Sequence, residues 1–131
     1  MPKILIVEDD RSVREMLKTC LEAQGYMVLA AENGRTAIEW VREVRLDLAI
    51  VDLGLPDMNG QEVCSAIKGD PKTRSTQILI LTGDVSNEAR IRGDADLFLT
   101  KPLAIADLKK AVGGLLEKAQ KRRLRPSARI N

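Results

Sequence analysis

Five short apolar runs that alternate with segments of helical spacing constrain the fold of this chain more than any other feature. Three of the runs are continuously apolar, which is typical of strands that are covered on both faces. Strands that alternate with helices indicate a parallel sheet with helices on both sides. The sequence therefore predicts an α/β fold with five strands, which are Ile4–Val7, Met27–Ala30, Leu48–Val51, Ile78–Leu81 and Leu97–Thr100.

The segments between these strands carry apolar residues at the spacing of amphipathic helices. In the first of them, Ser12 and Glu15 are placed as an N-terminal capping box. Right-handed crossovers leave few topologies for such an alternation. A flavodoxin-like, doubly wound (βα)5 fold with strand order 2-1-3-4-5 follows, and its ligand-binding crevice is expected between the first and third strands.

Acidic residues follow the two strands that border this crevice. Glu8-Asp9-Asp10 comes directly after the first strand, and Asp52 comes directly after the third. Carboxylates gathered there repel one another unless a cation lies among them, and Lys101 at the end of the fifth strand is a candidate. Oxygen ligands favour Mg²⁺, whereas the absence of histidine disfavours softer metals. Each of these acids could instead cap the helix that follows it, and Asp10 is the best candidate for that role. Capping does not explain why two acidic strand ends meet at one crevice.

Asp52 is also a candidate phosphoryl acceptor. A carboxylate can attack phosphorus and hold the phosphoryl group as an acyl phosphate, and positioning with charge stabilisation then supplies most of the catalysis. Lys101 offers a point charge for the phosphoryl oxygens. Thr82 offers a hydroxyl at the end of the fourth strand, where Gly83 leaves room for a donor. Considered alone, Thr82 is better explained as a strand-end threonine favoured by β-propensity. Lys101, considered alone, is explained at least as well as a solvated lysine before Pro102.

Four motifs fall on successive strand ends in order, and they are Glu8-Asp9, Asp52 with Leu55-Pro56-Asp57-Met58-Asn59-Gly60, Thr82-Gly83 and Lys101-Pro102. Together they resemble the signature of two-component response-regulator receiver domains, over residues 3 to about 118. The resemblance implies that Asp52 receives a phosphoryl group from a sensor histidine kinase or a histidine phosphotransfer protein in a Mg²⁺-dependent reaction. It also implies a conformational shift that controls binding of a downstream protein. Such a domain catalyses its own phosphorylation and slow autodephosphorylation, and no other enzymatic activity is expected.

The same resemblance assigns roles within the pocket. The implied Mg²⁺ ligands are Glu8 through water, Asp9, Asp52 and the backbone carbonyl of Gly54. Thr82 and Lys101 are implied to contact the phosphoryl oxygens, and Phe98 is implied to be the switch aromatic that moves with Thr82. Ordinary packing on the last strand is the alternative for Phe98.

The region between Thr82 and Lys101 departs from the family pattern. The two residues are 19 positions apart, fewer than is usual in the family, and the shortening falls in Asp84–Gly93. The fourth helix is therefore expected to be short or irregular. Gly54 and Asp84 occupy positions that look like those that tune phosphoryl lifetime in the family.

The length of 131 residues fits one domain, with a receiver over 1–118 and a basic, disordered tail over 119–131. Six bases lie in the last fourteen residues, whereas residues 1–117 hold 19 acids and 15 bases. A solvated extension explains the tail better than contact with nucleic acid or an acidic partner, and no specific nucleic-acid binding is expected. The chain looks like a stand-alone receiver or the receiver part of a longer protein.

Three other functions fit parts of the sequence. A degenerate receiver could act as a constitutive protein-interaction module without phosphorylation. A flavin- or nucleotide-binding protein needs a loop that cradles phosphate after the first strand, but Glu8-Asp9-Asp10 stands there. A Mg²⁺-dependent phosphatase with an aspartyl nucleophile has a second acid two residues after that nucleophile, where this chain has Gly54.

The remaining features set the expected surroundings. Cys20 and Cys64 lie in predicted helices with no ligand spacing, so both are expected to be buried free thiols. No signal peptide is visible, and no stretch approaches the roughly 20 apolar residues of a membrane span. We therefore expect a cytoplasmic protein without membrane contact, either monomeric or dimeric on phosphorylation.

Overall fold

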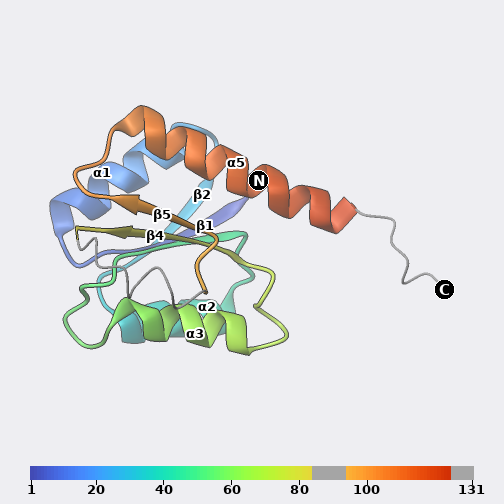
Figure 1. The fold of residues 1–131 in the computed structure, drawn as a ribbon, viewed down its shortest axis with the longest axis horizontal. Helices are drawn as coiled ribbons and strands as arrows, with labels where there is room; N and C mark the ends of the chain where they lie inside the picture. Colours follow the sequence, from blue (N-terminus) through green and yellow to red (C-terminus); the bar gives the residue numbers. More distant parts are fainter. Residues whose placement is uncertain (84–93, 125–131) are drawn as a thin grey trace.

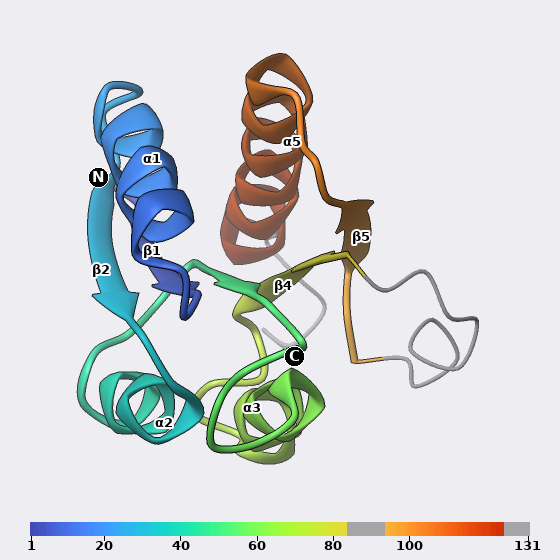
Figure 2. The same cartoon turned by 90° about the vertical axis from the view of Figure 1, so that its left-hand side faces the viewer.

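The computed structural model describes residues 1–83 and 94–124, and every predicted strand is present (Figure 1). In chain order the elements are β1 (Lys3–Val7), α1 (Arg11–Glu22), β2 (Met27–Ala31), α2 (Gly34–Glu43), β3 (Leu48–Val51), α3 (Gly60–Gly69), β4 (Gln77–Thr82), β5 (Leu97–Thr100) and α5 (Ile105–Leu124). Helices α1 and α5 cover one face of the sheet, and α2 and α3 cover the other (Figure 2). The predicted α/β architecture is confirmed.

The five strands form one parallel sheet in the order β2-β1-β3-β4-β5, as predicted. The crossover direction reverses at β1, which pairs with β2 on one side and β3 on the other. Val7 and Val51 are register partners at the ends of β1 and β3. Residues 8 and 52 therefore leave the sheet side by side.

Two apolar clusters explain why the strands are continuously apolar. In β1, Ile4 and Ile6 belong to the cluster beneath α1 and α5, whereas Leu5 and Val7 belong to the cluster beneath α2 and α3. All four side chains are at most 1% exposed. Successive strand residues point to opposite faces, so a sheet covered on both sides needs an apolar residue at every position.

The start of α1 differs from its prediction. Helix α1 begins at Arg11, and the side chain of Asp10 caps it by accepting the backbone N–H of Val13 at 3.1 Å. Ser12 lies inside the first turn, so the predicted capping box of Ser12 and Glu15 is wrong. The carboxylate of Asp10 satisfies a free N–H and also complements the positive end of the helix dipole. A capping box is present instead at α3, formed by Asn59 and Glu62.

Helix α5 is longer than expected. It continues to Leu124 and projects beyond the sheet (Figure 1), so residues 119–124 are helical rather than disordered. Ala119 is 7% exposed, and no proline interrupts the helix before residue 126. Lysine, glutamine and arginine favour the helix in this stretch. The rest of the predicted tail, 125–131, and the predicted short fourth helix over Asp84–Gly93 lie outside the described residues.

None of the helices in the described ranges, 1–83 and 94–124, combines the length and the hydropathy that crossing a bilayer requires.

Candidate functional site

The acids predicted to meet at the crevice do meet there. Glu8 directly follows β1 and Asp52 directly follows β3, and the backbone N–H of Asp52 donates to the carbonyl of Val7 at 3.0 Å. Glu8, Asp9 and Asp52 each place a carboxylate oxygen within 4.8 Å of the other two. Glu8 is only 2% exposed and Asp52 is 9% exposed, whereas Asp9 lies at the surface. The cluster therefore has a buried part and a side open to solvent.

Lys101 brings a positive charge into this cluster from the end of β5. Its Nζ donates to Oε1 of Glu8 at 2.6 Å and to Oδ2 of Asp52 at 3.1 Å. The backbone N–H of Lys101 also donates to the carbonyl of Thr82 at 2.9 Å, which fixes the residue beside β4. Three strand ends thus supply the charged groups of one site.

Burial and the neighbouring charged groups shift the pKa values of Glu8 and Lys101. Burial raises the pKa of Glu8, and the negative charge of Asp52 adds to this effect, while the hydrogen bond from Lys101 opposes it. Burial lowers the pKa of Lys101, but its hydrogen bonds to Glu8 and Asp52 outweigh burial and leave that pKa above its ordinary value. Lys101 therefore stays an ammonium ion at neutral pH.

The loop between β3 and α3 folds tightly against Asp52. The backbone N–H of Gly54 donates to Oδ1 of Asp52 at 3.1 Å, and Gly54 forms a bridge with Asn59 across the loop. Gly60 donates its backbone N–H to the carbonyl of Leu53 at 2.9 Å. A Cβ at Gly60 would lie 2.3 Å from the backbone oxygen of Asp52, so only glycine permits this approach. Gly60 belongs to the motif after Asp52, but the motif alone does not indicate this close approach.

Arg14 is a second contributor that sequence reasoning missed. Its Nη1 donates to the carbonyls of Glu8 and Asp9, at 2.9 and 3.2 Å. Oε2 of Glu8 in turn accepts the backbone N–H of Asp10 at 3.1 Å. These contacts fix the backbone of the acidic loop. The sequence signal for this role is a basic residue in the first turn of the helix that follows the acidic loop.

The other predicted residues lie at the same edge or next to it. Thr82 ends β4, is 4% exposed and pairs in register with Thr100. A Cβ at Gly83 would meet no atom of the described residues within 4 Å, in line with the open space predicted there. Phe98 is half-buried and packs against the cluster beneath α2 and α3, so its switch role stays a prediction. Asp84 lies outside the described residues.

The donor set of the cluster fits a hard divalent cation. Its ligand atoms are carboxylate oxygens, which suit Mg²⁺. One ammonium ion against three carboxylates also leaves the cluster negative. Neither cysteine belongs to it, because Cys20 lies in α1 and Cys64 is buried in α3.

Comparison with known proteins agrees with this arrangement. The family model described as the response regulator receiver domain matches residues 4–113. The chain belongs to this family. The prediction drawn from the four motifs is therefore confirmed, and the protein is a receiver domain of two-component signalling.

Relatives of this receiver domain include longer proteins. A probable transcriptional regulatory protein of Picosynechococcus is 34% identical over 128 residues, which cover 90% of this chain and 50% of the relative. The response regulator MprA of Mycobacterium tuberculosis is 35% identical over 121 residues, which cover 90% of this chain and 52% of the relative. The chain thus spans about half the length of these proteins.

Solved structures match this receiver domain along most of both chains. A CheY-like receiver domain protein from Methanospirillum hungatei has a TM-score of 0.87 at 29% identity, with 93% of this chain and 98% of that one covered. The response regulator TrrA of Thermotoga maritima, solved in complex with Mg²⁺-BeF, has a TM-score of 0.80 at 32% identity, with 88% and 99% covered. The flavodoxin-like fold is confirmed, and the roles of single pocket residues stay predictions.

Proposed function

We propose that Asp52 is the phosphoacceptor of this receiver domain and takes its phosphoryl group from a sensor histidine kinase or a histidine phosphotransfer protein. The observation that carries the proposal is the position of Asp52, beside the acids after β1 and in contact with the ammonium of Lys101. In the transfer, a carboxylate oxygen of Asp52 attacks the phosphorus of a phosphohistidine. A P–O bond forms as the P–N bond breaks, and the electron pair of that bond stays on the histidine nitrogen.

Two contacts orient the proposed nucleophile. Oδ1 of Asp52 accepts from the backbone of Gly54, and Oδ2 accepts from Lys101. The plane of the carboxylate is therefore fixed before a donor arrives, and fixed geometry is what phosphoryl transfer mainly requires. Lys101 lies close enough to neutralise oxygens of the incoming group, and the hydroxyl of Thr82 is assigned to the same oxygens.

Magnesium is part of this proposal. Glu8, Asp9, Asp52 and the carbonyl of Gly54 are the residues that would hold it, and the bound ion supplies positive charge to the phosphoryl oxygens. Oxygen donors that share a small negative site support this assignment. The solved structure of TrrA with Mg²⁺-BeF is a related case.

The proposed output is a change in partner binding. Moving an equilibrium from mostly inactive to mostly active takes about 5.5 kcal/mol of differential interaction. A hydrogen bond to a charged group contributes roughly 1.5–3 kcal/mol, so contacts from Lys101, Thr82 and the metal to one phosphoryl group supply most of that energy. Thr82 and Phe98 are the proposed switch pair. A cytoplasmic location, with the protein either monomeric or dimeric on phosphorylation, completes the proposal.

Intact-mass analysis tests the phosphoacceptor directly. The wild-type protein, incubated with Mg²⁺ and a small acyl-phosphate donor, is expected to gain one phosphoryl adduct, which Asp52→Asn abolishes. Asp70→Asn changes an exposed carboxyl at the end of α3 and should leave the adduct in place. Adducts on both the wild type and Asp52→Asn, or on neither, contradict the proposal. Turnover of a generic phosphate ester would instead support the phosphatase alternative.

A further inference from the structure

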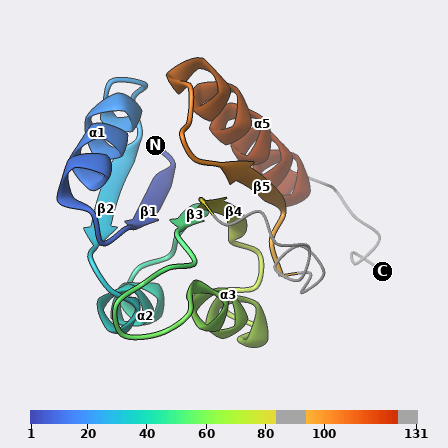
Figure 3. The same cartoon turned by 60° about the vertical axis from the view of Figure 1, so that its left-hand side comes forward.

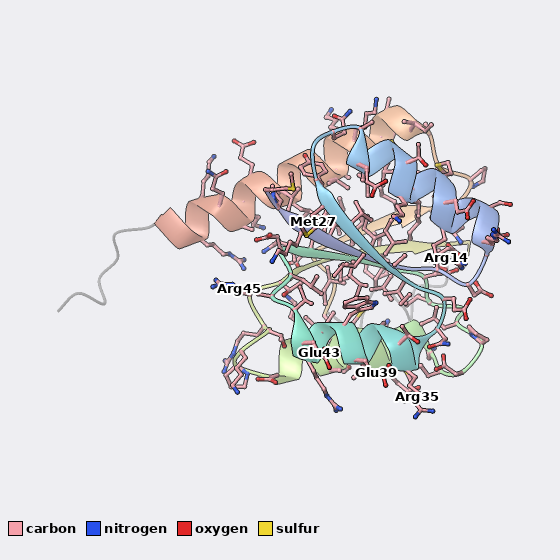
Figure 4. The ribbon with its side chains drawn as sticks, turned by 180° about the vertical axis from the view of Figure 1, so that it is seen from behind. Arg14, Met27, Arg35, Glu39, Glu43 and Arg45 are labelled. Carbon is pink, nitrogen blue, oxygen red and sulfur yellow. The ribbon has the colours of Figure 1, made fainter. Side chains whose placement is uncertain are left out.

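The loop after Asp52 is attached to a helix that carries none of the pocket residues. This acceptor loop, residues 53–59, meets the N-terminus of α2 through the carboxylate of Asp57. Oδ1 of Asp57 accepts the backbone N–H of Gly34 at 2.8 Å, and Oδ2 accepts that of Arg35 at 2.9 Å. Figure 3 shows the loop passing the end of α2 before it enters α3. Figure 4 labels Arg35 at this end of α2 and Glu43 at the other.

Asp57 contributes most of the side-chain cap of α2. The N–H groups of the first helical turn have no partner within the helix. In α2 the side chain of Asn33, the residue before the helix, accepts the N–H of Thr36 at 2.8 Å, whereas the N–H of Ala37 makes the first helical bond, to the carbonyl of Asn33 at 3.2 Å. Asp57 binds the two preceding N–H groups, those of Gly34 and Arg35. Two of the three side-chain capping bonds therefore come from the acceptor loop, more than 20 residues away in the sequence.

A second contact joins the same two segments. A Cβ at Gly34 would lie 2.4 Å from Cγ and Sδ of Met58, the next residue of the loop. Met58 also packs against the apolar cluster beneath α2 and α3. The absence of a side chain at Gly34 thus lets the tip of the loop lie directly on the helix. The hydrogen bonds to α2 lower the pKa of Asp57, so its carboxylate stays charged against the positive helix end.

The attachment of the tip restricts the base of the loop. Gly54 is held to Asp52 on one side and bridged to Asn59 on the other. Asp57 lies between these two anchors and fixes the tip from outside. Displacement of the tip from α2 therefore moves the backbone on which Gly54 lies.

We propose that Asp57 is a positioning residue of the phosphoryl site: by binding the N-terminus of α2, it holds the acceptor loop so that the Gly54 carbonyl and the Asp52 carboxylate are arranged for the divalent ion. The inference rests on the proposed function, because it concerns the same site. A cap that serves α2 alone predicts no effect on metal binding. The two interpretations therefore differ in a measurable quantity.

Asp57→Ala and Asn33→Ala form a matched pair for the test. Each variant removes side-chain caps from the start of α2, but only Asp57→Ala frees the loop. The apparent Mg²⁺ dissociation constant is read from the rise of the unfolding midpoint with Mg²⁺ concentration, compared within each variant. Asp57→Ala is expected to weaken Mg²⁺ binding about tenfold, the lower end of the loss seen when supporting partners of a metal site are removed. Asn33→Ala should leave the constant unchanged.

Asp57→Asn gives an intermediate case, because its amide keeps one acceptor oxygen and loses the charge. A smaller loss of Mg²⁺ affinity is expected, and at saturating Mg²⁺ both Asp57 variants should still form the phosphoryl adduct. Equal Mg²⁺ constants in Asp57→Ala and the wild type overturn the positioning role, as does an equal weakening by Asn33→Ala. A wild type that binds Mg²⁺ but gains no adduct overturns the proposed function alone, since the Mg²⁺ comparison between variants remains readable.

Discussion

At the scale of single residues, the acidic pocket has to balance its charges without much help from water. Glu8 is 2% exposed, and its carboxylate lies beside that of Asp52. Two carboxylates so placed repel one another strongly because solvent screens them poorly. Lys101 contacts both of them and is the group that allows them to be ionised together. It therefore has a structural role before any phosphoryl group arrives.

Replacement of this lysine has a predictable effect on stability. Lys101→Ala is expected to lower the free energy of unfolding in EDTA by about 2 kcal/mol, because the hydrogen bonds to Glu8 and Asp52 are lost and both charges remain. Added Mg²⁺ should restore more stability in this variant than in the wild type. Urea denaturation with and without Mg²⁺ measures both effects. Lys18→Ala, on the exposed side of α1, is the control and should change the free energy of unfolding little. If Lys101→Ala also left this free energy unchanged, Lys101 would not be needed to balance the charges of Glu8 and Asp52.

The thiols of Cys20 and Cys64 are expected to differ in reactivity because they are buried to different extents. Cys64 is 0% exposed, and burial, with help from the charge of Asp94, raises its pKa to about 12. Because the thiolate is the reactive form, Cys64 should resist alkylation in the native protein. Cys20 in α1 is half-buried and should react first with iodoacetamide at mildly alkaline pH. Mass spectrometry of peptides labelled before and after denaturation separates the two sites. If Cys64 in the native protein were labelled as fast as Cys20, burial would not protect its thiol.

At the scale of elements, the N-terminus of α3 packs closely against the backbone that follows β3. Its first residue, Gly60, has no room for a Cβ, which would lie 2.3 Å from the backbone oxygen of Asp52 and 2.8 Å from Cα of Leu53. At its last residue, Gly69, the same Cβ position has no atom within 4 Å in the part of the chain that the structure describes. The two glycines at the ends of one helix thus face opposite constraints.

Alanine substitutions at these two positions should therefore have opposite signs. Gly60→Ala pushes on backbone that cannot rotate away, and we expect a loss of roughly 1–3 kcal/mol in the free energy of unfolding. Gly69→Ala meets no atom and restricts the unfolded chain, so a gain of about 0.5 kcal/mol is expected. Chemical denaturation of both variants provides the comparison. Equal effects would mean that the close approach of Gly60 to Asp52 is not maintained in solution.

The same elements explain what the sequence could predict. The strands were predictable because burial on both faces requires an apolar residue at each position, and the carboxyl ends of such strands meet at one edge. The contact of Lys101 with Glu8, 93 positions away, followed from that rule alone. The cap of α2 by Asp57 and the close approach of Gly60 depend on how loops meet in space, and no local spacing records them. At α1, two cap candidates lay close together, and only the path of the chain after β1 decided between them.

At the scale of the whole molecule, one sheet separates two apolar layers, and most strand residues belong to one of them. Gln77, the first residue of β4, is an exception, because it is 0% exposed and polar. By strand alternation it shares a face with Leu79 and Leu81, which pack beneath α1 and α5. Neither side-chain atom of its amide has a hydrogen-bond partner among the residues that the structure describes. The neighbouring Thr76 is also buried, but its hydroxyl donates to the carbonyl of Leu46 at 2.9 Å.

Gln77 and Thr76 allow a comparison between a buried polar side chain without a hydrogen-bond partner among the described residues and one with a partner. Gln77→Met keeps the length of the side chain and removes an amide whose burial without a partner costs about 1–3 kcal/mol, so the free energy of unfolding should rise by up to that amount. Thr76→Val removes one half of a satisfied pair and leaves the carbonyl of Leu46 without it, so a loss of about 1 kcal/mol is expected. Urea denaturation of both variants at neutral pH decides the matter. Destabilisation by Gln77→Met would mean that the amide has a partner in solution, and the layer beneath α1 and α5 would then contain a polar contact rather than an uncompensated amide.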